Sequence, residues 1–432
     1  MSRFSITLST LLATVGVAVA QSPQTPSEGV DLHRTRLIPY ATDAAAADRQ
    51  LSKQRYMQPI VEWTRDAEGA LLGEFTYPFS WVERQVFLRV EGAGQPYEVW
   101  VNGKRAGASN NGFADAEYNI TKLAREDKNS VMLRLLPTES VAAIECFAHS
   151  QAQPRVYVLS QPRVRVRDIY YRTSLGVGKT VNVDFGVVMH NQTLGQKTSR
   201  IYYELMLNDT VRLSGGHRDV VLGMHGVDTM RFGAPMADTL LWTRERNPRI
   251  DLHLKNRIAG RDVEFYVVPV MLRDVQYRDG EFEVNGGVES LVWCDMEAAA
   301  TLADVESKVR GGVRAIRFKA GYVCDDILDY CDEQGLFVAL TAPINSSKSG
   351  MSRRRGGNPS NNPRWVADYV ERGVQMVHNT KRHPSVVAYY LADDSANGIC
   401  LYESYLAMKA VAGRRPVFYT DGGNEWNSDL KR

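Results

Sequence analysis

Long apolar runs and an excess of one charge are both missing from this sequence. No stretch of about 20 apolar residues occurs after the first residues, and a transmembrane helix needs that length. The 52 Lys and Arg residues balance 50 Asp and Glu residues, which leaves a net charge of only +2. Such a small net charge does not indicate nucleic acid or another polyanion as a partner. A membrane span and nucleic-acid binding are therefore not expected.

Cysteine is scarce, and its pattern excludes a disulfide framework. The five cysteines are an odd number, lie at wide spacings and form no C-x-x-C pair; they are Cys146, Cys294, Cys324, Cys331 and Cys400. The eight histidines show no spacing typical of metal ligands. We therefore expect buried free thiols, no metal site and no cofactor.

The first 20 residues have the three parts of a secretory signal. Arg3 supplies the basic start, an apolar stretch follows over 6–19, and Ala18-Val19-Ala20 is a small-x-small cleavage site. This pattern predicts export to the periplasm, the cell surface or the medium. Residues 21–50 are rich in Ser, Thr, Pro and Ala, a composition that predicts a flexible leader.

Two consecutive regions have the pattern of β-structure. Short β-branched and aromatic runs occupy 86–90, 97–101 and 131–135, and Asn102-Gly103 is typical of a hairpin turn. Evenly spaced short strands indicate a sandwich, which we place at 51–163. Polar and apolar residues alternate again in later runs, so a second β-sandwich is expected at 164–287.

From residue 288 the pattern changes to alternating strand and helix. Apolar runs at 313–318, 336–340 and 386–392 are separated by helical segments, one of which ends at Gly335. A further helix near 401–411 and a strand at 417–419 complete this rhythm, which is typical of a (β/α) barrel. Five strands are expected over 288–432, where a closed barrel has eight. The predicted class is multidomain β plus α/β, ending in a partial TIM-type barrel.

Ordered motifs in all three regions resemble one enzyme family. The first region carries Phe87-Leu88-Arg89-Val90-Glu91-Gly92, Val99-Trp100-Val101-Asn102-Gly103 and Asn119-Ile120-Thr121; the second carries Leu240-Leu241-Trp242-Thr243; the third carries Asp329 to Val338. In this order they resemble glycoside hydrolase family 2, the β-galactosidase and β-glucuronidase family. The resemblance implies a jelly-roll domain, an immunoglobulin-like domain and a catalytic barrel.

The same resemblance points to a pair of acidic residues as the catalytic position. Arg382-His383-Pro384-Ser385 leads into an apolar strand that ends in Asp393-Asp394, where the family has Asn-Glu. In the family the Asn bonds the 2-hydroxyl of the sugar, and the Glu is the acid/base. Asp394 thus stands at the acid/base position and Asp393 replaces the Asn. Asp is one methylene shorter than Glu, and a shift of about 1 Å can lower the rate about a hundredfold.

Other candidate site residues follow from the same comparison. Arg317 survives from the family's second-strand motif, and the rings of Tyr389, Tyr390 and Trp293 lie near predicted strand ends. All four are candidates for substrate binding, although core packing explains the aromatic residues as well. The family's nucleophile closes the seventh barrel strand, and this sequence stops after the fifth. Asp421 and Glu425 are the carboxylates nearest to that role, although a polar loop explains them as well.

Three hypotheses remain open at this stage. The first is a secreted family 2-like protein that has lost catalysis and acts as a carbohydrate-binding or scaffold component of an envelope assembly. The second is an active β-glycosidase with Asp394 as acid/base, and the third is a truncated gene product. The outer strands near 291–293 and 417–419 would be open edges, which predicts a homo-oligomer or an envelope protein partner.

Overall fold

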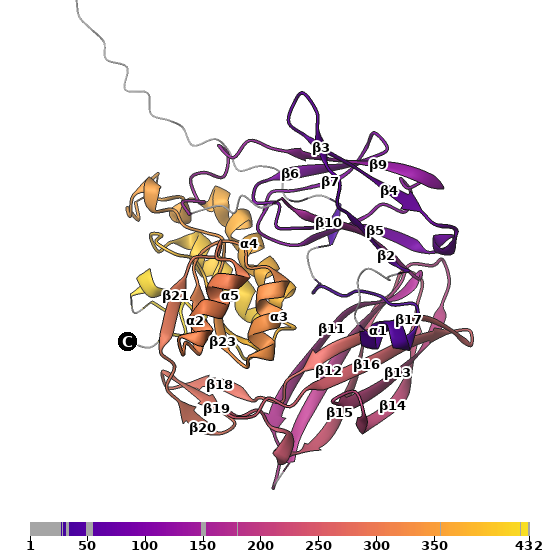
Figure 1. The fold of residues 1–432 in the computed structure, drawn as a ribbon. Helices are drawn as coiled ribbons and strands as arrows, with labels where there is room; N and C mark the ends of the chain where they lie inside the picture. Colours follow the sequence, from indigo (N-terminus) through magenta and orange to yellow (C-terminus); the bar gives the residue numbers. More distant parts are fainter. Residues whose placement is uncertain are drawn as a thin grey trace, which may run out of the picture.

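The computed structural model describes residues 27, 29–31, 34–48, 55–147, 153–178, 180–354, 356–423 and 425–430. The expected signal segment 1–20 lies outside these residues. The described chain forms two antiparallel β-sandwiches followed by a parallel α/β region, which confirms the predicted fold class (Figure 1). No helix in the described ranges is long and apolar enough to cross a membrane.

The first sandwich consists of two five-stranded sheets. One has the order β3 (Thr64–Arg65), β4 (Leu71–Tyr77), β9 (Asp127–Leu135), β6 (Tyr97–Val101) and β7 (Lys104–Ser109). The other has the order β1 (Val30–Asp31), β8 (Ala116–Asn119), β5 (Gln85–Glu91), β10 (Arg155–Gln161) and β2 (Met57–Ile60). Asn102 and Gly103, between β6 and β7, have φ values of 50° and 74°. Two positive φ angles are what a type I′ hairpin turn requires, so the predicted turn is confirmed.

The second sandwich has a three-stranded and a four-stranded sheet. The strands of the first are β11 (Val164–Leu175), β12 (Thr180–Asn191) and β15 (Val227–Ala237). Those of the second, in order, are β14 (Val211–Leu222), β13 (Lys197–Leu207), β16 (Ile250–Ile258) and β17 (Arg261–Val270). Alternate residues of these strands, such as Val183, Phe185 and Val187, are buried between the sheets, as a sandwich with polar outer faces requires.

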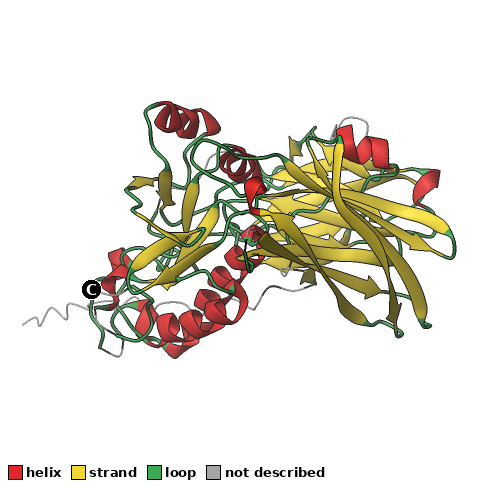
Figure 2. Cartoon of the chain, turned by 90° about the horizontal axis from the view of Figure 1, so that it is seen from below, coloured by secondary structure: helices red, strands yellow, loops and turns green. Residues whose placement is uncertain are grey.

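The α/β region is built on a parallel sheet with the order β21 (Trp293–Met296), β22 (Ala315–Phe318), β23 (Phe337–Thr341), β24 (Val386–Tyr390) and β25 (Val417–Phe418). The connecting helices are α2 (Leu302–Arg310), α3 (Asp325–Glu333), α4 (Val366–Thr380) and α5 (Ile399–Ala412). Figure 2 shows these helices gathered around the strands of this region. The predicted alternation of strand and helix is confirmed.

A small antiparallel meander covers the other face of the parallel sheet. It comprises β18 (Val275–Arg278), β19 (Glu281–Val284) and β20 (Gly287–Glu289), and it lies beside the strands in Figure 1. The rings of Tyr277 and Phe282 contact Phe418, with centroid distances of 5.0 and 6.3 Å. Phe282 also contacts Trp293 at 5.9 Å. The meander thus buries apolar residues on this face of the parallel sheet.

The outer edge of β25 is not open either, which corrects the expectation for 417–419. The backbone amide of Asp429 donates to the Val417 carbonyl at 2.9 Å, and the Val417 amide donates to Asp429 Oδ2 at 2.7 Å. The Tyr419 amide donates to Ser428 Oγ at 2.9 Å. Because these groups already have partners, β25 offers little to a pairing strand. Association with a second copy or an envelope protein stays a prediction.

Residues 34–40 form a strap that crosses all three domains, so the expected flexible leader is wrong for this segment. Arg34 pairs with Glu117 of the first sandwich, and both side chains are buried. Thr35 donates from its amide and its hydroxyl to Asp168 Oδ1 in the second sandwich, at 3.2 and 2.9 Å.

The strap continues to the α/β region and then to a short helix. Arg36 Nη1 lies 3.1 Å from Asp326 Oδ1 of α3. Tyr40 exchanges two backbone hydrogen bonds with Phe265 of β17, and α1 (Asp43–Asp48) follows beside that strand. A segment with a disorder-like composition is thus ordered by partners that lie far away in the sequence.

The buried Arg34–Glu117 pair gives a test of the strap. We expect Arg34→Ala to lower the free energy of unfolding by about 3 kcal/mol, because it leaves a buried carboxylate with less compensation. Lys104→Ala, which removes an exposed cation outside the strap, should change it by less than about 0.5 kcal/mol. Urea unfolding monitored by tryptophan fluorescence measures both. Equal midpoints for the two variants would show that the strap does not stabilise the fold.

Candidate functional site

The two adjacent carboxylates Asp393 and Asp394 lie just beyond the carboxyl end of β24, the fourth strand of the parallel sheet. In barrel folds, the loops at this end of the strands carry the catalytic residues. The Asp393 amide donates to the Ile344 carbonyl at 2.9 Å, and the Ser346 amide donates to the Asp394 carbonyl at 3.1 Å. The loop that follows β23 therefore fixes the backbone of the pair.

The Asp393 carboxylate is fully engaged by its own chain. Arg317 Nη2 donates to Oδ1 at 2.9 Å, and the Ala320 backbone amide donates to Oδ2 at 2.7 Å. Burial raises the pKa of Asp393; the Ala320 amide and the Arg317 guanidinium oppose that rise, while the charge of Asp394 adds to it. Asp393 thus acts as an acceptor that joins β22 to β24. It has no amide to donate to a sugar hydroxyl.

Asp394 has the opposite environment. Its side chain is exposed, and no hydrogen bond or ion pair to its carboxylate occurs among the described residues. The chain therefore does not fix the direction of this carboxyl group. A proton donor in a glycosidase must be held within reach of the leaving oxygen, and an unsupported side chain meets this requirement poorly.

Arg317 connects three strands at this end of the sheet. Its guanidinium carbon lies 4.2 Å from the ring centroid of Tyr390, which is a cation–π contact. Its Nη1 also lies 3.9 Å from Asp295 Oδ2 of β21. Beside it, Lys319 Nζ pairs with Glu297 at 3.0 Å. The predicted residues Arg317, Tyr390 and Asp393 therefore form an internally paired cluster, and Asp394 lies beside it without a partner among the described residues.

Two of the predicted substrate-binding rings do not face the cluster around Asp393 and Asp394. Tyr389 is 0% exposed, belongs to the core under the helices, and has its hydroxyl 3.2 Å from that of Thr380. Successive strand residues point to opposite faces, so Tyr389 and Tyr390 cannot both face a ligand. Trp293 starts β21 and packs against Phe282 of the meander, near the amino ends of the strands. Both are packing residues.

The alternative nucleophile candidates differ from each other. Glu425 pairs with Arg353 Nη1 at 2.7 Å and accepts a hydrogen bond from the Tyr402 hydroxyl. Asp421 lies in a 3-10 turn after β25 and is exposed. Glu425 is thus used to hold a loop and is half-buried, whereas Asp421 is the more exposed of the two.

A buried polar network under Asp394 was not predicted from the sequence. Ser346 Oγ donates to Asn358 Oδ1 at 2.8 Å and contacts Ser395 Oγ at 2.9 Å, while Asn358 Nδ2 donates to the Ser346 carbonyl at 2.9 Å. All three side chains are buried. Ser346 and Asn358 flank a run of three arginines at 353–355, a composition typical of a solvated loop, so the sequence alone gives no sign of the network.

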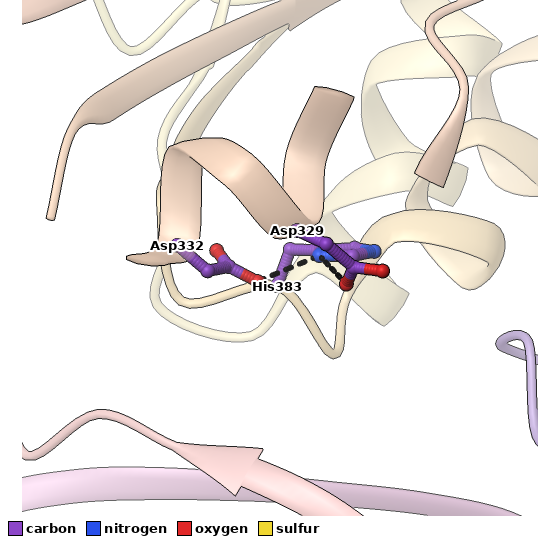
Figure 3. Close-up of side chains that lie close together, drawn as sticks. All are labelled: Asp329, Asp332 and His383. Atoms are coloured by element: carbon purple, nitrogen blue, oxygen red, sulfur yellow. Dashed lines mark hydrogen bonds and ion pairs between the residues drawn. The ribbon is translucent and has the colours of Figure 1, made fainter. Parts of the chain in front are cut away.

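A second charged cluster lies at the opposite, amino end of β24. Figure 3 shows Asp329 and Asp332 of α3 facing His383. His383 Nδ1 lies 2.7 Å from Asp332 Oδ2, and Nε2 lies 3.5 Å from Asp325 Oδ1. Burial opposes the charged imidazole, but the carboxylates of Asp332 and Asp325 outweigh it and raise the pKa of His383 to about 9.

These carboxylate and imidazole atoms are close enough to hold a cation, but the cluster already contains positive charge. Arg382 Nη2 lies 3.5 Å from Asp329 Oδ1, and the protonated His383 occupies the space between the carboxylates. The cluster therefore joins α3 to β24 through an imidazolium, and we assign no metal to it.

Comparisons with known proteins agree with this architecture. Residues 313–431 match the family model described as glycosyl hydrolases family 2, TIM barrel domain. Over these residues the chain is similar to glycoside hydrolase family 2. The β-galactosidase of Priestia megaterium is 22% identical over 378 residues, which cover 81% of this chain and 36% of that protein. That of Psychromonas ingrahamii is 24% identical over 380 residues, which cover 81% and 35%.

Solved structures of glycoside hydrolase family 2 share the fold. A family 2 member from Bacteroides cellulosilyticus superimposes with a TM-score of 0.69 at 14% identity, over 81% of this chain and 47% of that one. A β-glucuronidase from Bacteroides uniformis gives 0.66 at 16% identity, over 90% and 52%. The chain thus spans about a third to a half of the length of the proteins that it matches.

The imidazolium cluster predicts a pH-dependent stability. Because the pKa of His383 is raised from 6.5 to about 9, its charged form stabilises the fold below pH 6.5. This contribution, about 3 kcal/mol, should be lost as the pH rises through about 9. Thermal unfolding of the wild type and of His383→Gln from pH 6.5 to about 9 measures this contribution. The difference in stability between the two proteins should shrink as the pH rises.

His190→Gln is the matched control for that experiment. Burial lowers the pKa of His190 to about 4, so this residue is already neutral across the tested range. Its substitution should leave the slope of stability against pH unchanged. A constant difference between wild type and His383→Gln from pH 6.5 to about 9 would contradict the proposed imidazolium.

Proposed function

We propose that this family 2-like protein has lost ordinary glycosidase activity, and that it binds carbohydrate or serves as a scaffold in an envelope assembly. The observation that carries the proposal is the internal use of Asp393. Arg317 and the Ala320 amide bind both of its oxygens, at 2.9 and 2.7 Å. The position that resembles the family's sugar-binding Asn is therefore a structural acceptor.

The state of Asp394 supports the same proposal. A retaining glycosidase needs two positioned carboxyl groups about 5 to 5.5 Å apart, one as acid/base and one as nucleophile. Asp394 is shorter than Glu and is exposed, and no described side chain orients it. Of the two carboxylates considered as its partner, Glu425 is paired with Arg353. An ordinary double displacement has little support from these residues.

The carbohydrate part of the proposal rests on the relatives and on the exposed groups that remain. The curated relatives are named β-galactosidases, and several of the similar structures are β-glucuronidases. The open end of the sheet still presents Asp394, Asp295 and Lys319, which can exchange hydrogen bonds with hydroxyl groups. A weak site for a neutral sugar is compatible with this arrangement.

Hydrolysis assays with purified protein test the loss of activity. On nitrophenyl β-galactoside and β-glucuronide we expect turnover at least about a thousandfold below a typical value of about 10 per second. Asp394→Ala should not lower any residual rate. Glu281→Ala, an exposed carboxylate of the meander, is the matched control. Turnover of about 10 per second that disappears only in Asp394→Ala would establish the rival hypothesis of an active β-glycosidase.

Export is the second part of the proposal. The basic start at Arg3, the apolar stretch to Val19 and the small residues Ala18 and Ala20 support cleavage after Ala20. N-terminal sequencing of protein recovered from the envelope or the medium should therefore begin at Gln21. A recovered protein that still begins at Met1 or Ser2 would contradict processing.

A further inference from the structure

A groove with an unbalanced charge lies between the two β-sandwiches. Its volume is about 880 Å³, and none of its lining residues belongs to the α/β region. Four segments form most of it: 82–84, 162–164, 193–202 and the β16–β17 hairpin around 257–263. It is therefore separate from the cluster around Asp393 and Asp394.

Cations dominate the lining of this groove. Six of the lining residues are basic and two are acidic; the basic ones are Arg84, Arg163, Lys197, Arg200, Arg257 and Arg261, and the acidic ones are Glu83 and Asp219. The whole chain has almost equal numbers of basic and acidic residues. The groove thus carries an excess of positive charge, although the protein as a whole is nearly neutral.

Some of these cations are already paired, and others are not. Arg200 pairs with Asp219 at 2.6 Å, and Arg257 pairs with Asp262 at the same distance. Among the described residues, no ion pair involves Arg163, Lys197 or Arg261, and all three are exposed. These three side chains form the free basic set of the groove.

Arg84 adds a fixed charge to the wall. Its guanidinium donates to Ser160 Oγ at 2.9 Å and to the carbonyls of Ser160 and Val263 at 3.0 and 3.2 Å. It also lies 3.7 Å above the ring centroid of Tyr56. These neutral partners hold the guanidinium in a fixed position at the wall of the groove.

Neutral hydrogen-bonding groups lie among the charges. The side chains of Gln196 and Thr198 are exposed beside Lys197 in the lining. An amide and a hydroxyl can each donate to and accept from the hydroxyl groups of a sugar. A ligand rich in hydroxyl groups can bind through such hydrogen bonds without an apolar wall or a free aromatic ring.

We propose that this groove binds an anionic polysaccharide, whose carboxylate or sulfate groups pair with Arg163, Lys197 and Arg261 while its hydroxyl groups bond to Gln196 and Thr198. Charge complementarity carries the proposal, and such attraction weakens as salt is added. Its choice of a sugar polymer over other polyanions rests on the proposed function. The binding itself does not depend on Asp394.

Direct binding to the full chain tests the groove. Polygalacturonate supplies carboxylates, chondroitin sulfate supplies sulfates as well, and dextran is the neutral polymer; thermophoresis in about 50 mM salt measures each affinity. Substitution of all three free cations, Arg163→Ala, Lys197→Ala and Arg261→Ala, should weaken binding of the anionic polymers at least about tenfold. Dextran, which has no charge to pair with the groove, should show no difference between the two proteins.

The matched control removes the same charge elsewhere. Lys104→Ala, Lys122→Ala and Lys308→Ala together change three exposed lysines that do not line the groove. This variant should stay within about twofold of the wild type, because the attraction is local at this ionic strength. Circular dichroism of both triple variants checks that they are folded.

The remaining outcomes are decisive as well. Equal weakening by the two triple variants would show a diffuse charge effect and would overturn the groove. No binding of either anionic polymer in about 50 mM salt would overturn the proposal too. If single-stranded DNA of matched charge bound more tightly than both polymers and lost affinity in the groove variant, the ligand class would be wrong. A hydrolytically inactive protein that bound neither anionic polymer would refute the groove alone, whereas an active protein that bound them through the groove would refute only the proposed loss of activity.

Discussion

A parallel sheet has to be buried on both faces, and this constraint organises the α/β region. Helices α3 to α5 cover one face, where Val338, Tyr389 and Val417 lie in a single core. The meander covers the other through Tyr277, Phe282 and their contacts with Phe418. The order of the elements follows, because the meander directly precedes the sheet it must cover.

Contacts around Arg273 and Gly335 join the second sandwich to the α/β region. Arg273, just before the meander, donates to the carbonyls of Gly335, Leu336 and Pro384 at 3.0, 2.9 and 2.8 Å. Gly335 has φ 64°, and a Cβ there would lie 2.2 Å from Trp242 Nε1. Only glycine permits both the turn and this close approach. The amino end of the sheet is thus closed by contacts with the second sandwich and the segment that follows it.

The elements could be predicted from the sequence where their signals are local, and their pairing could not. The strands 86–90 and 97–101 have clear periodicity, and Gly335 ends a helix as expected. The strap at 34–40, in contrast, is ordered by partners distant in the sequence, which its composition does not indicate. Tyr389 and Tyr390 are adjacent and identical in type, yet the pleat of the strand places Tyr389 in the core and Tyr390 against Arg317. Contacts across strands leave no trace in a local pattern.

The net charge of the sequence does not predict how charge is distributed over the structure. At the sheet end Arg317 and Lys319 face Asp393 and Glu297, so positive and negative groups cancel within the chain. In the groove Arg163, Lys197 and Arg261 have no such partners among the described residues. The net charge of +2 sums the paired charges at the sheet end and the unpaired cations of the groove, so it describes neither place. Attraction over a few ångströms depends on where unpaired charges meet, so a nearly neutral protein can still carry one strongly basic surface.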